Sequence, residues 1–229
     1  MLNNLLFVLS AAFIVCFIHL CKRQGKETLF AWVVLQSILA NFFVLKQITL
    51  FGLNATASDI FAVGAILGLN LMQTQFGAEL AKKAIWASFS CMIFFCLISQ
   101  AHLLYTPSVY DQTHDAYRQL LSPSPRILLG SLIAFFIVQQ FDVFLFGKFK
   151  IWFSNWSFTR TSLICLLISQ ALDTVLFAFL GLYGLVEKIW EVIVVGYVIK
   201  TMTIILMMSL FSAANKARPV GNSQGDHQA

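Results

Sequence analysis

Long apolar runs alternate with short polar segments along almost the whole chain. A helix needs about 20 mainly apolar residues to cross the hydrocarbon core of a bilayer. The pattern predicts about seven such helices, at residues 2–20, 28–50, 59–77, 84–105, 127–147, 162–184 and 190–212. We therefore expect an all-α, polytopic membrane helical bundle that forms one transmembrane domain over residues 1–212. The polar residues 213–229 are expected to form a disordered cytoplasmic tail.

The third apolar run is the weakest of the seven. Its apolar core, from Ile60 to Met72, is short and contains Gly64, Gly68 and Asn70. One interpretation is an ordinary short, tilted helix. The alternative is six full helices plus one broken or re-entrant helix, which a membrane protein tolerates where the segment lines a cavity.

The composition excludes an ordinary soluble fold. The chain is 59% hydrophobic and only 11% charged, whereas soluble domains are about 45–50% apolar and about 25% charged. Lipid can cover the excess apolar surface. The net charge of +5 does not indicate a nucleic-acid partner, because the basic residues are scattered over short loops.

The basic residues are distributed unevenly between the two sides of the predicted bundle. Three of them, Arg118, Arg126 and Lys188, fall on one side. Ten fall on the other side: Lys22, Arg23, Lys26, Lys82, Lys83, Lys148, Lys150, Arg160, Lys216 and Arg218. Because cytoplasmic loops are enriched in lysine and arginine, this bias places the N-terminus outside and the C-terminus in the cytoplasm. We expect a multi-pass protein of the cytoplasmic, or inner, membrane.

At least four charged residues fall inside the predicted spans, among them Lys46, Asp142, Asp173 and Lys200. Each costs about 2.5–3.5 kcal/mol at the centre of a bilayer, so we expect them to face the bundle interior, where acids and lysines can neutralise each other. Several amides accompany them. Single amides can simply hold helices together by hydrogen bonds, but four ionised groups favour a functional cavity.

The fifth and sixth predicted helices share a polar pattern. Residues from Ser131 and from Ser162 both read S-L-I-x-x-x-I-x-Q-x-x-D. In each helix the glutamine and the aspartate are three residues apart and share one face. Consecutive spans run antiparallel, so the two faces can meet across a central site, as in transporters built from repeated elements.

Nucleotide-binding and hydrolase patterns are missing from the sequence, which has no P-loop, no G-x-G-x-x-G and no G-x-S-x-G. The four histidines match no zinc-binding spacing. We expect no metal, no cofactor and no enzymatic activity.

Several polar motifs resemble those of the queuosine precursor transporter family, over roughly residues 30–210. The most specific is S-Q-x-x-D-T-x-x-F, which begins at Ser169. Asn70 and Thr74 stand where the family has carboxylates. The spacing of that family segment is kept by Asn70, Thr74, Gly77 and Ala81. The matching positions elsewhere are Asn41, Lys46 and Gly52; Asp142; Ser169, Gln170, Asp173, Thr174 and Phe177; and Tyr197 and Lys200.

This resemblance implies import of a purine-like small molecule, a 7-deazaguanine base such as 7-cyano-7-deazaguanine, 7-aminomethyl-7-deazaguanine or queuine. Such a base offers N–H donors, which a carboxylate accepts, beside a carbonyl, which an amide or ammonium can serve. We expect Asp173 or Asp142 to accept the donors. The predicted substrate-binding residues are Asp173, Asp142, Gln170, Gln139, Asn70, Lys46, Asn41 and Lys200.

Other functions fit the same sequence. Either aspartate can instead couple transport to protons. The chain can also be the substrate-binding membrane subunit of a multi-component, vitamin-type uptake system, or a membrane-embedded enzyme or assembly factor.

Overall fold

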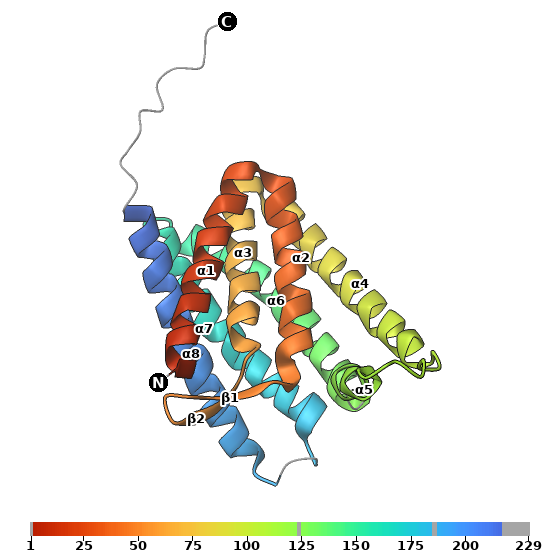
Figure 1. Cartoon of the computed structure of the whole chain (residues 1–229). Coiled ribbons are helices and arrows are strands. Elements are labelled where there is room, and N and C mark those ends of the chain that lie inside the picture. The colour runs from red at the N-terminus through yellow and green to blue at the C-terminus, as the bar shows by residue number, and fades with distance from the viewer. Residues whose placement is uncertain (1, 123–124, 185–186, 217–229) are drawn as a thin grey trace, which may run out of the picture.

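The computed structural model describes residues 2–122, 125–184 and 187–216 and shows a bundle of long helices (Figure 1). The described part contains seven long helices, one for each predicted run, together with the short α5 (His114–Leu121). The long helices are α1 (Leu2–Gln24), α2 (Lys26–Phe42), α3 (Asp59–Phe76), α4 (Ala78–Leu103), α6 (Pro125–Trp152), α7 (Phe158–Phe177) and α8 (Ile189–Lys216). A short 3₁₀ turn, η1 (Phe43–Leu45), follows α2, and a π-helical turn, η2 (Ala178–Leu182), continues α7.

The outer surface of the bundle is apolar. Large side chains such as Phe94, Leu97 and Val194 are more than half exposed, which a soluble protein avoids over a contiguous surface. Among the described helices, five are long and apolar enough to cross a membrane: α1, α4, α6, α8 and the continuous segment of α7 and η2. These observations confirm the predicted all-α membrane bundle. The number of crossing helices remains a prediction.

Helix α3 lies at the centre of the bundle and contacts α1, α2, α4, α6, α7 and α8. Residues 63–73 are all buried. A helix enclosed by protein does not need a lipid-soluble surface, which explains the weak apolar signal of the third run. The helix is continuous from Asp59 to Phe76, so the alternative of a broken helix is wrong.

The second predicted run, residues 28–50, is only partly helical. Helix α2 ends at Phe42, and after η1 the chain forms an antiparallel hairpin of β1 (Gln47–Leu50) and β2 (Leu53–Thr56). The two-residue turn has positive φ at both positions, 50° at Phe51 and 83° at Gly52, the conformation that matches the twist of a tight hairpin. The prediction of an uninterrupted helix to residue 50 was therefore wrong.

The start of α1 holds this hairpin in place. The Asn3 amide donates a hydrogen bond to the Thr49 carbonyl at 3.2 Å, and the Phe51 N–H donates to Asn4 Oδ1 at 3.1 Å. Lys46 precedes β1 and its side chain is exposed, so its predicted place inside a span was wrong. Lys46 therefore lies on the same side as Arg118, Arg126 and Lys188, and the count of basic residues on the two sides becomes ten against four.

The two sides of the predicted membrane lie at opposite ends of the bundle. In Figure 1 the α1–α2 connection and the end of α8 lie at the top, and the hairpin lies at the bottom. The charge bias assigns the top to the cytoplasm. Helix α8 extends to Lys216, four residues beyond the predicted span, and the rest of the expected tail, residues 217–229, lies outside the described residues.

This orientation predicts the labelling of cysteines introduced into two exposed loops. In a chain whose five cysteines are replaced by alanine, Ser108→Cys, between α4 and α5, should react with a membrane-impermeant maleimide in intact cells. Asn155→Cys, between α6 and α7, should react only after the membrane is opened. The reverse labelling pattern would show that the α1–α2 end of the bundle faces the outside.

A close contact between α6 and η2 depends on two glycines. A Cβ atom on Gly130 would lie 2.8 Å from both Cα and N of Gly181, so the two backbones approach as small residues allow in membrane helices. Gly130→Ala should lower the free energy of unfolding by about 1–3 kcal/mol, because backbone atoms cannot rotate away. Thermal unfolding in detergent measures this loss.

Gly147→Ala is the matched control. Its Cβ would meet only the end of a flexible side chain, Gln73 Nε2, at 3.0 Å, and we expect a loss below about 1 kcal/mol. Equal losses in the two variants would show that the backbone contact between α6 and η2 is not what makes Gly130 necessary.

Candidate functional site

A cavity of about 720 Å³ lies at the hairpin end of the bundle. Its wall is formed by the hairpin, the ends of α2 and α7, η2, and the starts of α3, α6 and α8. It reaches the surface at exposed residues such as Gly52 and Glu191. Cavities that bind small molecules usually have volumes of about 300–1,000 Å³. In the orientation that the charge bias predicts, the mouth of this cavity faces the outside.

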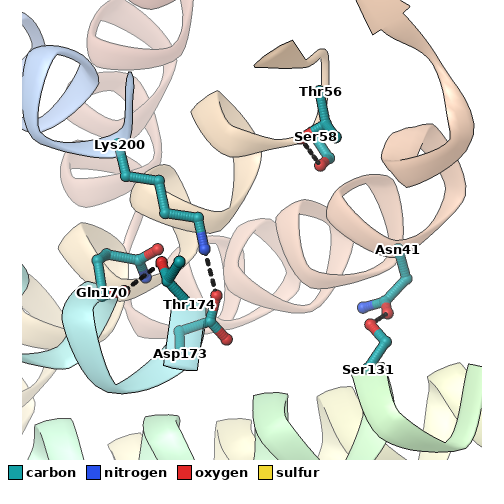
Figure 2. A network of polar contacts seen from close by, with 8 residues as sticks. All are labelled: Asn41, Thr56, Ser58, Ser131, Gln170, Asp173, Thr174 and Lys200. Atoms are coloured by element: carbon teal, nitrogen blue, oxygen red, sulfur yellow. Dashed lines mark hydrogen bonds and ion pairs between the residues drawn. The ribbon is translucent and has the colours of Figure 1, made fainter. Parts of the chain in front are cut away.

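An ion pair stands in the cavity wall. The Lys200 ammonium on α8 donates to a carboxylate oxygen of Asp173 on α7 (Figure 2). The two side chains are 11% and 22% exposed, so both are largely withdrawn from water. Pairing is the usual arrangement of charges inside a membrane protein. The structure thus brings together two of the eight predicted residues, from helices that are adjacent in the chain.

A second carboxylate, Asp59, was missed by the sequence analysis. It is the first residue of α3, lines the cavity and is only 7% exposed. Lys200 interacts electrostatically with Asp59 as well as with Asp173. The predicted span 59–77 begins at Asp59, which was not named among the charged residues inside the spans. The available signal was an acid at the first position of an apolar run, where the helix dipole favours negative charge.

The hairpin side of the cavity contributes hydroxyl groups. Thr56, at the end of β2, and Ser58, before α3, have their side-chain oxygens 2.9 Å apart (Figure 2). Both residues line the cavity beside Asp59. The junction of β2 and α3 therefore supplies a carboxylate and two hydroxyl groups in four consecutive residues.

Asn41 and Ser131 connect two walls of the cavity. Ser131 Oγ on α6 donates to Asn41 Oδ1 on α2 at 2.6 Å (Figure 2). The Asn41 amide donates to the Ser37 carbonyl at 3.1 Å and to Met92 Sδ at 2.8 Å. Both ends of the amide are thus engaged within the protein, and Asn41 fixes the position of the wall in this conformation.

Two aromatic rings complete the cavity wall. Phe135 on α6 and Phe177 on α7 both line the cavity and are partly exposed. Flat aromatic faces suit a flat heterocycle, since offset stacking adds to the burial of apolar area. The cavity therefore combines paired charges, hydroxyls and aromatic rings.

Asp142 lies deeper than the cavity and is fully buried. Ser169 Oγ on α7 donates to Asp142 Oδ1 at 2.6 Å. Because α6 and α7 run antiparallel, Asp142 faces Ser169 and not Asp173. Ser169 lies about one helical turn before Asp173 on α7. The shared pattern of the two helices thus brings Asp142 next to a serine, and the two aspartates occupy different environments.

Other buried polar residues belong to the same region, which we call the deep polar layer. Gln73 Nε2 on α3 donates to the Val143 carbonyl at 3.0 Å. By helical spacing, residues three positions apart share a face, which groups Asn70 with Gln73 and Gln139 with Asp142. The deep polar layer consists of Asn70, Gln73, Gln139, Asp142, Ser169 and Gln170, all buried.

The eight predicted binding residues thus occupy three environments. Three line the cavity: Asp173, Lys200 and Asn41. Four belong to the deep polar layer: Asp142, Gln139, Gln170 and Asn70. Lys46 is exposed at the start of the hairpin. Their roles in binding remain predictions.

Comparisons with known proteins identify the family. Residues 56–214 match the profile of a family described as "Putative vitamin uptake transporter". The chain is also 29% identical over 210 residues to a protein of Bacillus subtilis (strain 168) named "Probable queuosine precursor transporter", an alignment that covers 86% of this chain and 88% of the relative. No solved structure matches the chain.

The family match covers more than half of the chain and includes α3 to α8, from which most of the cavity wall is built. It confirms the resemblance inferred from the polar motifs. The matched family and the named relative are both described as transporters rather than enzymes. The chain belongs to the vitamin uptake transporter family and is a multi-pass membrane transporter.

Proposed function

We propose that this transporter imports a queuosine precursor, a 7-deazaguanine base, across the cytoplasmic membrane. The observation that carries the proposal is the ion pair of Lys200 and Asp173, with the carboxylate of Asp59 in the same wall, in a cavity of about 720 Å³. The name of the Bacillus subtilis relative supports the same class of cargo.

The polar edge of such a base matches these three side chains. A carboxylate accepts the paired N–H donors of the base, and an ammonium donates to its carbonyl. Asp173 uses one oxygen for Lys200 and keeps acceptor capacity on the other. We assign the N–H donors of the base to Asp173 and Asp59, and its carbonyl to the remaining N–H groups of Lys200. Without such partners, removing the polar edge from water would be costly.

Other residues receive roles according to their position, and Asp142, which does not line the cavity, is assigned no contact with the base. Phe135 and Phe177 hold the ring by its faces. Asn41 keeps the cavity wall in place through Ser131. Alternating access requires a path from the cavity to the cytoplasm. We assign Asn70, Gln139 and Gln170 to that path, where their amides meet the base after it leaves the cavity.

Lys46 is assigned to the entry of the base. It is exposed immediately before Gln47, which lines the cavity. From this position the Lys46 side chain meets the base only at the mouth of the cavity.

Rescue of a deficient cell tests the proposal. The chain is expressed in a bacterium that can neither synthesise the precursor nor import it, and single 7-deazaguanine bases are supplied in the medium. Queuosine should reappear in transfer RNA with at least one of them. If the protein is present in the membrane and no supplied base restores queuosine, the assigned cargo is wrong.

Uptake by the purified chain separates a complete transporter from a substrate-binding subunit. In liposomes that contain this chain alone, labelled base should enter with saturable kinetics. Binding without entry would instead identify a subunit that requires a separate energising complex.

A further inference from the structure

The carboxylate of Asp142 is an unusual group in this bundle. Its side chain is fully buried, and its single hydrogen-bond partner in the described part of the chain is Ser169 Oγ, on Oδ1. Oδ2 is also buried and makes no hydrogen bond to the described residues. A buried carboxylate of this kind requires a partner that the surrounding side chains do not provide.

No cation of the described residues neutralises Asp142. Lys200 pairs with Asp173, and none of the ion pairs in the described ranges includes Asp142. An isolated charge costs several kcal/mol in such a place. Binding a proton removes the charge and with it this cost.

The helices around Asp142 offer few other titratable groups. Helix α6 packs against α3, α4, α7 and η2. Helix α7 contributes the Cys165 thiol, which interacts electrostatically with Asp142, and Asp173, which is paired with Lys200. At this depth α3 presents the uncharged Asn70 and Gln73, and η2 has no titratable residue. The titratable side chains of α4 are Glu79, Lys82, Lys83, Cys91 and His102, all exposed, and Cys96, partly exposed.

A polar stripe on α7 connects Asp142 to the cavity. Asp173 and Thr174 line the cavity, and Gln170 and Ser169 lie three to five positions earlier on the same face of the helix. The Ser169 hydroxyl then contacts Asp142. Polar side chains thus lie at successive turns of α7 between the cavity and the buried carboxylate.

We propose that Asp142 is a proton-binding site, separate from the substrate cavity, that couples uptake of the base to the inward movement of a proton. This inference rests on the proposed function. The proton binds Oδ2 while the cavity is open to the outside. The new O–H can donate to the amide oxygen of Gln139, which shares the face of Asp142 and has no partner among the described residues. The proton leaves when the site opens to the cytoplasm.

The variant Asp142→Asn separates coupling from transport, because its amide resembles the protonated acid and cannot release a proton. We expect it to exchange labelled for unlabelled base across liposomes at nearly the wild-type rate. An inward gradient of one pH unit, with one proton per base, supports up to about tenfold accumulation. Wild type should approach this accumulation of the base, and Asp142→Asn should show no accumulation. A pH dye inside the liposomes should report base-dependent acidification only for wild type.

Two further variants control for structural effects. Ser88→Ala removes another fully buried polar group, on α4, whose hydroxyl has no partner among the described residues, and it should keep both exchange and accumulation. Ser169→Ala removes the hydrogen bond to Asp142 and should change the pH at which uptake is half-maximal while exchange continues. Ser169→Ala therefore tests the site even if Asp142→Asn does not fold.

Several results would overturn the inference. The inference is excluded if a pH gradient drives accumulation in Asp142→Asn, or if Ser169→Ala leaves the pH dependence of uptake unaltered. It is also excluded if wild-type accumulation follows a sodium gradient instead of a pH gradient. If wild type exchanges the base but never accumulates it with a pH gradient, coupling to protons is excluded while transport stands. If wild type does not exchange the base at all, the proposed function itself fails.

Discussion

Replacing Asp173 by asparagine is expected to lower uptake of the base at least about 100-fold and to destabilise the protein by about 3 kcal/mol. The loss of stability arises because the Lys200 ammonium, only 11% exposed, keeps its charge and loses its partner. The loss of uptake arises because the charge-assisted hydrogen bond from the base to Asp173 disappears and Lys200, no longer held by Asp173, loses its bond to the carbonyl of the base, each worth about 1.5 kcal/mol. Unfolding in detergent and uptake into liposomes measure the two effects.

A paired substitution separates the two effects. In Asp173→Asn combined with Lys200→Gln, both charges are removed and a neutral hydrogen bond can replace the ion pair. We expect stability to return to within about 1 kcal/mol of wild type, whereas uptake stays as low as in the single variant. Recovery of uptake in the double variant would mean that Asp173 serves only to neutralise Lys200 and does not bind the base.

Replacing Asp59 by asparagine is expected to lower uptake about 10- to 100-fold and to change which base is preferred. With both carboxylates ionised, Asp59 and Asp173 together exceed the single positive charge of Lys200 by one negative charge. Glu191, at the mouth, does not add to this excess because it pairs with Lys188 at 2.8 Å. A net negative site favours 7-aminomethyl-7-deazaguanine, which carries an ammonium, over the uncharged 7-cyano base.

Competition against a labelled base measures this preference. In wild type the aminomethyl base should compete about tenfold better than the cyano base, which corresponds to about 1.4 kcal/mol. In Asp59→Asn the two should compete about equally. Glu191→Gln is the matched control, because its carboxylate also lines the cavity but is exposed and already paired, and uptake should change less than threefold. An unchanged preference in Asp59→Asn would show that this carboxylate does not face the cargo.

The long helices were predictable from the sequence because a bilayer requires apolar runs of a fixed minimum length. Seven predicted runs correspond to the seven long helices of the described residues. The hairpin after α2 was not predictable from its own residues, because its strands are apolar enough to extend a span. Its position depends on contacts with Asn3 and Asn4 in the first turn of α1. Composition does not encode such contacts between residues that are far apart in the sequence.

The candidate site was predicted in part. The cost of charge in lipid identified Asp173 and Lys200, and the structure pairs them. Asp59 was missed because it lies at a helix boundary, where an acid is ordinarily explained by exposure or capping. The similarity of α6 and α7 indicated a shared site for Asp142 and Asp173. The antiparallel stagger of the helices, which residue spacing alone does not reveal, instead separates the two carboxylates by depth.

The enclosure of α3 has a consequence for how the protein is made. A segment that carries Asp59, Asn70 and Gln73 partitions poorly into lipid by itself, because acidic and amide side chains oppose insertion from the translocation channel. It contacts α2 and α4, its neighbours in the chain, and these can shield it as they emerge from the ribosome. We therefore expect α2, α3 and α4 to insert cooperatively as one unit, and a nascent chain that ends directly after α3 to be degraded by quality-control proteases.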